Sequence, residues 1–572
     1  MLSPTLAEDR PKAADPEPKA VRGTSGLPSA VSGLASAVLL WVAFPPIGWS
    51  WLAWVALAPL FLQIVSVRSR ASLYFGAWAG GMAFWLLSIH WVRLTDETAW
   101  LAWMVMALAL SAWWPGFLAL ARLAVLRLRL PVMIAAPVLW VGLEFIRAYV
   151  LTGFPWYYLA HSQHRVLPLI QIADFAGALG LSFLIALVNA WWVDLLTLPL
   201  LRPTDRGPRL ARAQVVRLAA LVALLGATVG YGTYRLASAR FRPGPRLALL
   251  QSNIIQRYKM SAGPEELIAI YRRLINRALR SPGRPDLIVW PETSYPYGYV
   301  EIDPGLAPAE FARQVTRLAG KRTMEDWRAW KVAVARQLHS WTDEIGVPML
   351  VGAVTYDFRR DGPSKFNSAI LFTPGAEAIQ SYHKVHLVPF GEYVPLVESL
   401  PWLTVLTPYR GTQVPNLTFG RAASWFQLGP YRLAAAICFE DTVPQAVRRL
   451  FRGDGGNRQP DLVLNLSNDG WFHGSSEHDM HLATSVFRAV ENRVPLARAV
   501  NTGISALIDS NGRILDALPK LTEGVLSKTV QLDDRTSLYS AWGDWLGLSC
   551  LAVSIGLLPL ALARDLLARL RS

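Results

Sequence analysis

Long apolar segments separated by short polar ones occupy the first 240 residues and return near the end of the chain. Each segment is long enough to cross roughly 30 Å of hydrocarbon as a helix. Seven of the eight precede a long polar region. They lie near residues 27–44, 49–67, 72–92, 99–121, 131–150, 171–198, 216–236 and 545–563. The pattern therefore predicts a polytopic α-helical membrane domain with eight spans.

From Arg246 the pattern changes to short β-rich runs separated by turn residues, among them RLALLQSNI, DLIVWPET, PMLVGAVTY, KFNSAILFTP, YRLAAAICFED and DLVLNLSND. Helical stretches lie between some of these runs, at 263–280, 307–345 and 478–491. Strands that are apolar along almost their whole length are buried on both faces, which is typical of layered α/β structures. An α/β domain is therefore predicted over residues 241–540.

Four parts follow from these patterns. Residues 1–26 are rich in Pro, Ala and charge, and they have no apolar core followed by a cleavage site. They are predicted to form a disordered tail and not a signal peptide. Seven spans then occupy residues 27–240, before the α/β domain at 241–540. Residues 541–572 contain the eighth span and a short tail.

Basic residues are distributed unevenly among the connections between the spans. Because Lys and Arg near span ends stay in the cytoplasm, both chain ends are predicted inside and the α/β domain outside. This distribution also explains much of the net charge of +15, so no nucleic-acid partner is expected. The residues on the predicted inner side include Arg10, Lys12, Lys19, Arg22, Arg68, Arg70, Arg122, Arg127, Arg129, Arg202, Arg206, Arg209, Arg212, Arg217, Arg564, Arg569 and Arg571.

The chain has two cysteines, and their settings differ. Cys550 lies within the last apolar segment, whereas Cys438 ends an apolar strand in AAAICFED. Without a disulfide partner in its domain, Cys438 is either a packing residue or a nucleophile, and packing is the commoner role of a buried thiol. The adjacent Glu440 and Asp441 favour the nucleophile, because a purely apolar site would not usually place two carboxylates beside a core thiol.

Two further charged residues stand at predicted strand ends. Glu292 lies in IVWPETS and Lys384 in YHKVHLVPFGEYVP. Each alone is compatible with an ordinary surface charge, but clefts of α/β proteins form where strands end at their carboxyl side, so Glu292, Lys384 and Cys438 are explained together by one site. A thiolate attacks a carbonyl, a carboxylate takes the thiol proton, and an ammonium stabilises the oxyanion. HExxH, GxSxG, GxxxxGK[ST] and CxxC motifs are absent from the sequence.

The motifs WPETS, KVHLVPFGEYVP and ICFED, in this order, resemble the Glu-Lys-Cys signature of the nitrilase superfamily. With seven spans before the domain and one after it, the chain resembles the membrane-embedded branch of that superfamily, the apolipoprotein N-acyltransferases. The resemblance implies a four-layer αββα sandwich with Glu292 as general base, Lys384 as oxyanion stabiliser and Cys438 as nucleophile. It also implies that Glu392 is a second active-site glutamate and that Glu440 supports the site.

The resemblance further implies the substrates and the location. A phospholipid, typically phosphatidylethanolamine, would acylate Cys438, and the α-amine of a diacylglyceryl-cysteine in an apolipoprotein would receive the acyl chain. The expected location is a bacterial inner membrane, with the catalytic domain in the periplasm. A monomer without cofactor or metal is expected. Two residues depart from the family pattern: Met260 stands where a tryptophan is usual, and Phe439 where a tyrosine is common.

Aromatic residues follow the fifth predicted span in the segment TGFPWYY, residues 152–158. Their composition is typical of an interfacial belt, so Trp156 and Tyr158, together with Met260, are predicted to border the lipid entrance. Placing the charged side chains of Glu144 and Arg147, within the fifth span, in lipid costs free energy. The two residues are therefore predicted to pair with each other across one helical turn.

Several histidines suggest metal ligands by their spacing, notably His473, His478 and His481 in WFHGSSEHDMH and the pair in HKVH around Lys384. No carboxylate-histidine ligand set matches a known helical spacing, and the thiol mechanism needs no metal. A polar lip near the substrate is the simpler prediction for these histidines.

Two other functions are compatible with part of this pattern. A membrane-tethered, nitrilase-like amidase would give the acyl group to water, but tethering needs only one span and eight are predicted. A catalytically idle scaffold that binds lipoproteins would not need Glu292, Lys384 and Cys438 together.

Overall fold

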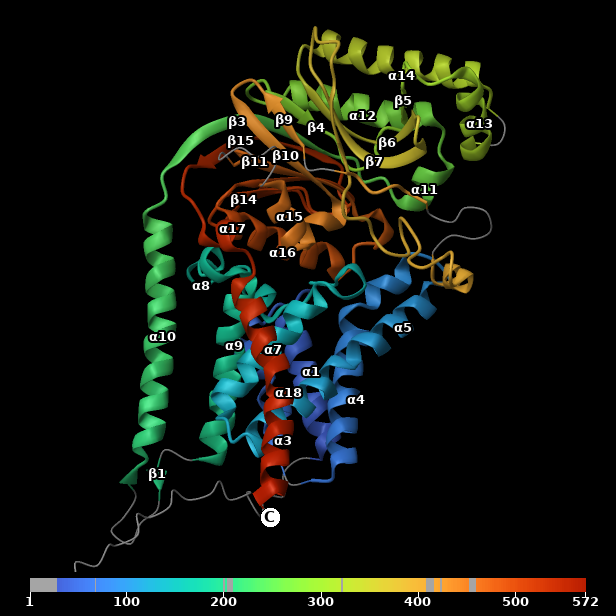
Figure 1. Ribbon diagram of the computed structural model, residues 1–572. Coiled ribbons are helices and arrows are strands. Elements are labelled where there is room, and N and C mark those ends of the chain that lie inside the picture. Colours follow the sequence, from blue (N-terminus) through green and yellow to red (C-terminus); the bar gives the residue numbers. More distant parts are fainter. Residues whose placement is uncertain are drawn as a thin grey trace, which may run out of the picture.

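The computed structural model describes residues 28–66, 68–198, 201–202, 209–319, 322–407, 416–421, 424–451 and 459–571. An α/β domain lies over one end of a bundle of helices (Figure 1). The predicted N-terminal tail, 1–26, lies outside the described residues.

The helical part contains a helix at each of the eight predicted segments. The longer elements are α1 (Ser29–Ala43), α2 (Ala53–Ala56), α3 (Ala58–Val65), α4 (Arg70–Ser88), α5 (Ala99–Ser111), α6 (Trp113–Arg122), α7 (Val132–Arg147), α9 (Ala173–Thr197), α10 (Arg212–Ala237) and α18 (Trp545–Arg571). Four helices in the described ranges are long and apolar enough to cross a membrane: Ala99–Arg127, Ala173–Thr197, Arg212–Ala237 and Trp545–Arg564. The count of eight spans is therefore not confirmed.

The shorter helices fall below the length of a simple span. With 15 residues, α1 is about 22 Å long at 1.5 Å per residue. It packs closely on α4 through glycines, because a Cβ at Gly33 would lie 2.0 Å from the carbonyl oxygen of Gly76. Small residues of this kind bring two membrane helices into backbone contact.

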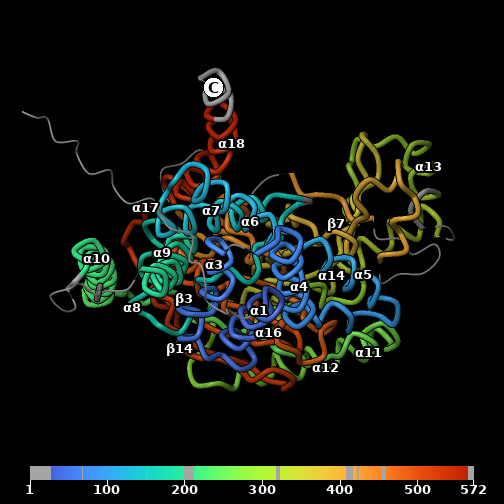
Figure 2. The backbone as a smooth tube through the Cα atoms, turned by 90° about the horizontal axis from the view of Figure 1, so that it is seen from below, coloured from blue at the N-terminus to red at the C-terminus, as the bar shows by residue number. Residues whose placement is uncertain are grey.

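The helices α18 and α10 differ in how closely they pack against the rest of the bundle. α18 packs along α7, where a Cβ at Gly142 would meet Ser554 Oγ at 2.8 Å. α10 instead stands beside the rest of the bundle (Figures 1 and 2). In the most apolar window of α10 only 17% of the residues are buried, against 67% in α9, so α9 is central and α10 peripheral.

The α/β domain contains two sheets. One has the order β15-β3-β4-β6-β7-β8, with β5 pairing β6 at its side, and the other has the order β14-β13-β12-β11-β10-β9. The strands are β3 (Phe241–Gln251), β4 (Leu287–Val289), β5 (Tyr299–Ile302), β6 (Met349–Arg359), β7 (Gly362–Phe372), β8 (Gln380–His383), β9 (Trp425–Leu428), β10 (Tyr431–Ile437), β11 (Leu462–Asn468), β12 (Leu496–Asn501), β13 (Ala506–Ile508), β14 (Ile514–Ala517) and β15 (Gly524–Asp533).

Alternate residues of β3 face opposite layers. Leu247 and Leu249 join the core between the two sheets, while Ala248 and Leu250 pack against the outer helices α12 (Pro264–Leu279) and α14 (Met324–Ile345). On the other side, α15 (Pro444–Leu450) and α16 (Ser476–Asn492) cover the second sheet and separate it from the helical part (Figure 1). The arrangement is the αββα sandwich that the family resemblance implies.

Several elements differ from the sequence prediction. The single helical stretch 307–345 is divided into α13 (Pro308–Ala319) and α14, because Thr323 caps the second helix in a reciprocal capping box with Asp326. Strand β15 was not predicted, although it pairs with almost the whole of β3. Its many partly exposed residues hide the apolar pattern of a buried strand.

Candidate active site

Glu292 lies three residues beyond the end of β4, and its side chain joins the two sheets. Its Oε1 accepts a hydrogen bond from Asn367 Nδ2 on β7 at 2.7 Å. Its Oε2 accepts one from the backbone N–H of Asn468, at the end of β11, at 2.9 Å. With 7% of its surface exposed, the carboxylate is held on both oxygens between segments that come from different sheets.

Lys384 follows β8 directly and is 1% exposed. Its Nζ lies 2.9 Å from Glu392 Oε2 and 3.5 Å from Glu292 Oε1. Burial by itself would lower the pKa of Lys384, but the two carboxylates outweigh burial, and the pKa is raised. The side chain is therefore a fixed ammonium ion between two glutamates.

One amide connects those two glutamates. Asn367 Nδ2 donates to Glu292 Oε1 at 2.7 Å and to Glu392 Oε1 at 2.9 Å, and Glu392 Oε2 accepts from the backbone N–H of Val388 at 2.8 Å. Asn367 is not among the site residues predicted from the sequence. The available signal was an asparagine inside the apolar run KFNSAILFTP, since a polar residue in a buried strand needs a hydrogen-bonding partner.

Cys438 begins a 3₁₀ turn, Cys438–Thr442, directly after β10. Its φ of 52° lies in the left-handed region, which is rare for residues other than glycine and persists only where the surroundings enforce it. Burial and the charge of Glu292 raise the pKa of the Cys438 thiol, while Lys384 opposes the shift. The resting thiol therefore keeps its proton, and attack on a carbonyl requires a nearby base.

Glu440 ties the Cys438 turn to the segment that carries Lys384. Its Oε2 accepts from the N–H of Ile437 at 2.7 Å, and its Oε1 accepts from the N–H groups of Val385 and His386 at 2.7 and 2.9 Å. Burial raises the pKa of Glu440 to about 7. A carboxylate that bridges two backbone segments fixes their spacing, as expected for a residue that supports the site.

Comparisons with known sequences show the family of the chain. The family described as apolipoprotein N-acyltransferase N-terminal domain matches residues 36–191, and the carbon-nitrogen hydrolase family matches residues 246–539. A protein of Geobacter metallireducens named apolipoprotein N-acyltransferase is 36% identical, over 92% of this chain and 94% of that protein. The chain belongs to the apolipoprotein N-acyltransferase family.

A second relative and a solved structure also match the chain. The protein of that name from Rhodopirellula baltica is 30% identical, over 89% of this chain and 93% of its own length. Among solved structures, a carbon-nitrogen hydrolase from Helicobacter pylori G27 matches 50% of this chain and 88% of its own, with 13% identity and a TM-score of 0.34.

The two positions at which this family member departs from the usual residues lie in different surroundings. Phe439 is partly buried, and its ring stacks on that of His386 with 5.8 Å between centroids. Met260 lies in the short helix α11 (Gln256–Ser261) and is 64% exposed. The structure thus leaves Met260 free to meet a ligand or lipid from outside the domain.

The predicted aromatic belt at residues 152–158 is wrong. Trp156 is 3% exposed and Tyr158 2%, because both are enclosed where the helical part meets the α/β domain. Trp156 packs on His481 with ring centroids 5.8 Å apart, and Tyr158 stacks on His161 at 5.2 Å. These aromatic residues therefore pack where the two parts of the molecule meet, and their place at a lipid entrance stays a prediction.

The predicted polar lip is also wrong for two of the three histidines in WFHGSSEHDMH. His473 is exposed, but His478 and His481 are 0% and 1% exposed. Both lie on α16, which is sandwiched between the second sheet and the helical part (Figure 1). A helix covered on two sides buries polar residues that look solvent-exposed in the sequence.

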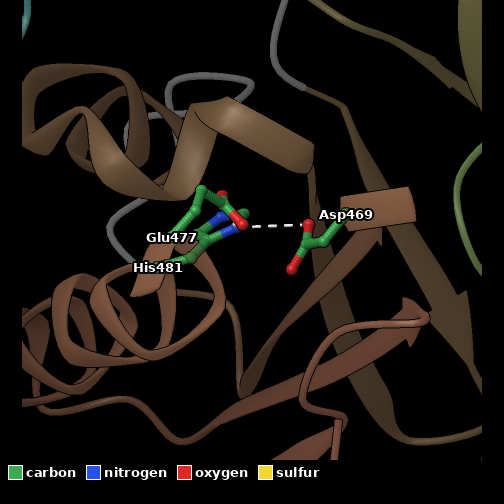
Figure 3. Close-up of side chains that lie close together, drawn as sticks. All are labelled: Asp469, Glu477 and His481. Carbon is green, nitrogen blue, oxygen red and sulfur yellow. Dashed lines mark ion pairs between the residues drawn. The ribbon is translucent and has the colours of Figure 1, made fainter. Parts of the chain in front are cut away.

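His481 belongs to a buried cluster of charges. Figure 3 shows Glu477 and His481 of α16 facing Asp469 from the turn after β11. The His481 Nε2–H donates to Asp441 at 2.7 Å, while Nδ1 lies 3.4 Å from Asp469 and 3.5 Å from Glu477. These donor types suit a cation, and their ligand atoms lie within 4.8 Å of one another. Arg498 already pairs with Asp441 at 2.7 Å, and the surrounding carboxylates raise the pKa of His481, so internal ion pairs account for the cluster.

Glu144 and Arg147 do not pair as predicted. Glu144 Oε1 accepts from Trp140 Nε1 and from the backbone N–H of Leu159, both at 3.0 Å. Arg147 donates to the carbonyl oxygen of Trp156 at 2.7 Å. Glu144 and Arg147 therefore each hold a segment that only tertiary folding brings to α7. Within the described part of the chain, no ion pair joins these two side chains.

Proposed function

We propose that this chain moves a fatty acyl group from a phospholipid, with phosphatidylethanolamine as the first donor to test, to the N-terminal amine of a diacylglyceryl-cysteine in an apolipoprotein. The acyl group travels as a thioester on Cys438. Membership of the apolipoprotein N-acyltransferase family supports this reaction. The observation that carries the mechanism is the buried Lys384 ammonium, which two carboxylates hold beside the turn that bears the thiol.

The first half-reaction forms the thioester. Glu292 takes the proton from the Cys438 thiol, and the thiolate attacks the ester carbonyl of the phospholipid. The Lys384 ammonium stabilises the oxyanion of the tetrahedral intermediate. When the ester C–O bond breaks, the leaving lysophospholipid oxygen takes the proton from Glu292. The acyl carbon is then bound to sulfur.

The second half-reaction uses the same groups in reverse. Glu292 takes a proton from the α-amine of the lipoprotein, and the amine attacks the thioester carbonyl. The C–S bond breaks as the amide bond forms, and the proton on Glu292 returns to sulfur. Glu392 keeps Lys384 charged and in place throughout, so both half-reactions share one oxyanion site. The kinetic consequence is a ping-pong mechanism.

We also propose that both chain ends are cytoplasmic, that the eight helical segments lie in a bacterial inner membrane, and that a monomer works with its α/β domain in the periplasm. Basic groups from distant segments support this orientation. Arg122 donates to the carbonyl oxygen of Ser66 at 2.9 Å, and Arg564 donates to that of Arg127 at 2.6 Å. These arginines gather at the end of the bundle opposite the α/β domain, as the rule for cytoplasmic basic residues requires.

Mass spectrometry of the purified protein tests the chemistry. With phosphatidylethanolamine alone, wild-type protein should carry an acyl adduct on Cys438 and release lysophospholipid. Addition of a diacylglyceryl peptide should discharge the adduct onto the peptide amine. Cys438→Ala and Cys438→Ser should both be inactive, since Glu292 is a weak base toward a hydroxyl group. Acyl transfer by Cys438→Ala would refute the thioester, and release of free fatty acid with no transfer would indicate a hydrolase.

A further inference from the structure

A second lysine stands next to the turn that carries Glu292. Lys259 lies on α11, and its Nζ donates to Thr293 Oγ1 at 3.0 Å and to the carbonyl oxygen of Glu292 at 3.4 Å. Thr293 has a φ of 44°, so this turn is held in an unusual backbone conformation. The Lys259 ammonium is thus hydrogen-bonded to the backbone of the proposed general base, whereas Asn367 and Lys384 contact the carboxylate of that residue.

Lys259 has no carboxylate partner in the part of the chain that the structure describes. Both of its hydrogen-bond acceptors are neutral oxygens. Burial lowers the pKa of Lys259 to about 8, against the opposing effect of Glu292, so most of the side chain is still protonated at neutral pH. A partly buried ammonium without a counter-ion favours the binding of an anion.

Two exposed apolar residues lie close to Lys259 in the sequence. Met260 is 64% exposed and Ile255 49% exposed, and both adjoin Lys259 in the same short segment. Arg257 of α11 reaches towards the helical part, with its Nη2 3.8 Å from Glu97 Oε1. A cation flanked by exposed apolar residues, on an edge that faces the helices, has the chemistry to receive an anionic amphiphile.

We propose that Lys259 binds the phosphate oxyanion of the phospholipid that donates the acyl chain. The inference rests on the proposed function, because it concerns the donor of that reaction. In a glycerophospholipid the phosphate and the acyl esters share one glycerol, so a phosphate held beside the Glu292 turn presents an ester to Cys438. The diacylglyceryl-cysteine acceptor has no phosphate. Lys259 therefore acts in the first half-reaction and not in the second.

The alternative role of Lys259 is to hold the Glu292 turn in place. The two roles differ in their kinetic effects. A positioning residue for Glu292 would affect both half-reactions and every acyl donor, since Glu292 handles the proton in all of them. A phosphate-binding residue affects only donors that carry a phosphate, and chiefly at lipid concentrations below saturation.

The test compares Lys259→Met with Lys259→Arg in full-length protein in detergent micelles. With limiting phosphatidylethanolamine, formation of the Cys438 adduct should be slowed about tenfold or more in Lys259→Met, the usual order for losing a charge-assisted hydrogen bond. Lys259→Arg should recover most of the rate. With p-nitrophenyl palmitate, which has no phosphate, the loss in Lys259→Met should be less than about twofold. In Lys259→Met, discharge of preformed acyl-enzyme onto a diacylglyceryl peptide should also be slowed by less than about twofold.

A matched control is Lys528→Met, which removes a lysine that donates to Leu515 O on the far edge of the domain and is 41% exposed. This variant should react with all donors like the wild type. Equal losses for the two donors in Lys259→Met, or a slower discharge step, would overturn the proposal in favour of a positioning role. Millimolar inorganic phosphate should leave the rate of Cys438 acylation in the wild type unchanged. If phosphate slows the wild type but not Lys259→Met, the site binds free phosphate. Failure of the wild type to form any adduct would instead refute the proposed function.

Discussion

Individual residues in the site depend on shared hydrogen bonds. Two glutamates beside one lysine leave an excess negative charge, and both carboxylates are largely buried. The Asn367 amide donates to both of them, which reduces their mutual repulsion without adding a titratable group. The position of Glu292 therefore depends on a neutral side chain from β7.

Replacing Asn367 with alanine should slow formation of the Cys438 adduct roughly tenfold or more, because Glu292 and Glu392 each lose a buried hydrogen bond. The measurement is single-turnover acylation followed by mass spectrometry. Asn276→Ala, at an exposed position on α12, is the control and should behave as wild type. An unchanged rate in Asn367→Ala would show that the lysine alone orients the two glutamates.

The pair formed by His481 and Asp441 contributes to stability in a defined pH range. Asp441 and Asp469 raise the pKa of His481 well above 6.5, although burial and Arg498 oppose this shift. Burial would raise the pKa of Asp441, but His481 and Arg498 lower it below 3.8. A raised histidine pKa stabilises the fold fully below pH 6.5, and this contribution is lost as pH rises through the folded-state value. A lowered aspartate pKa stabilises it above pH 3.8.

His481→Gln should therefore be less stable than the wild type, and the difference in melting temperature should be largest between about pH 4 and 6.5. It should shrink as pH rises towards the alkaline range. Thermal unfolding at a series of pH values measures it, with His473→Gln, at an exposed position, as the control. A difference that grows with pH would mean that His481 is neutral in the folded protein.

At the scale of elements, the site is built from turns that follow strands. Glu292, Lys384 and Cys438 lie after β4, β8 and β10, and β4 runs parallel to its neighbours β3 and β6. Gly352 on β6 lies against the Glu292 turn: a Cβ there would stand 2.1 Å from the carbonyl oxygen of Pro291 and 2.9 Å from Glu292 Cα. The absence of a side chain at Gly352 lets the turn approach the sheet.

Gly352→Ala should displace Glu292 and lower the rate of Cys438 acylation by roughly 10²-fold, the scale of a 1 Å error in a catalytic group. Circular dichroism should show that the sheets remain. The matched change is Gly263→Ala, at the N-cap of α12, where a Cβ meets no atom within 4 Å. Near wild-type activity in Gly352→Ala would indicate that the turn can move without losing the proton transfer.

At the scale of the whole molecule, Asp174 joins three parts. It lies in the first turn of α9 and is 2% exposed. Its Oδ2 pairs with Arg493, which ends α16, at 2.6 Å and with Arg235 of α10 at 2.8 Å, and its Oδ1 accepts from Tyr231 at 2.6 Å. One carboxylate thus connects the bundle, the peripheral helix and the α/β domain.

Asp174→Asn should destabilise the protein by roughly 3 to 5 kcal/mol, because the buried Arg493 and the partly exposed Arg235 lose their shared counter-ion. Thermal unfolding in detergent and limited proteolysis of the α/β domain measure the loss. Asp534→Asn breaks an ion pair in which the aspartate is 74% exposed, so it should change the melting temperature little. Similar effects of the two substitutions would show that Asp174 does not hold the parts together.

The proposed orientation is tested by labelling single cysteines in a Cys438→Ala, Cys550→Ala background. Glu325→Cys, exposed on α14, should react with a membrane-impermeant maleimide in intact spheroplasts. Ala213→Cys, exposed at the start of α10, should react only after permeabilisation. The reverse pattern would contradict both the orientation and a periplasmic reaction.

The sequence by itself determined those features that depend on neighbouring residues. Long apolar runs indicated the helical segments, and continuous apolar strands indicated the α/β sandwich. Glu292, Lys384 and Cys438 stood out because one site explains three such groups at the ends of predicted strands together. The hydropathy pattern overestimated span length, however, because it does not show where turns shorten a helix.

Only the tertiary structure decided which distant segments meet. Asn367 meets Glu292 across 75 positions, Lys259 meets Thr293 across 34, and His481 meets Asp441 across 40, and no local pattern encodes those contacts. The same reason explains the burial of Trp156 and Tyr158, which carry the composition of a membrane interface but are covered by α16 and its neighbours. Burial is a property of the assembled layers, so polar and aromatic residues that look exposed in the sequence become internal once the α/β domain lies on the helices.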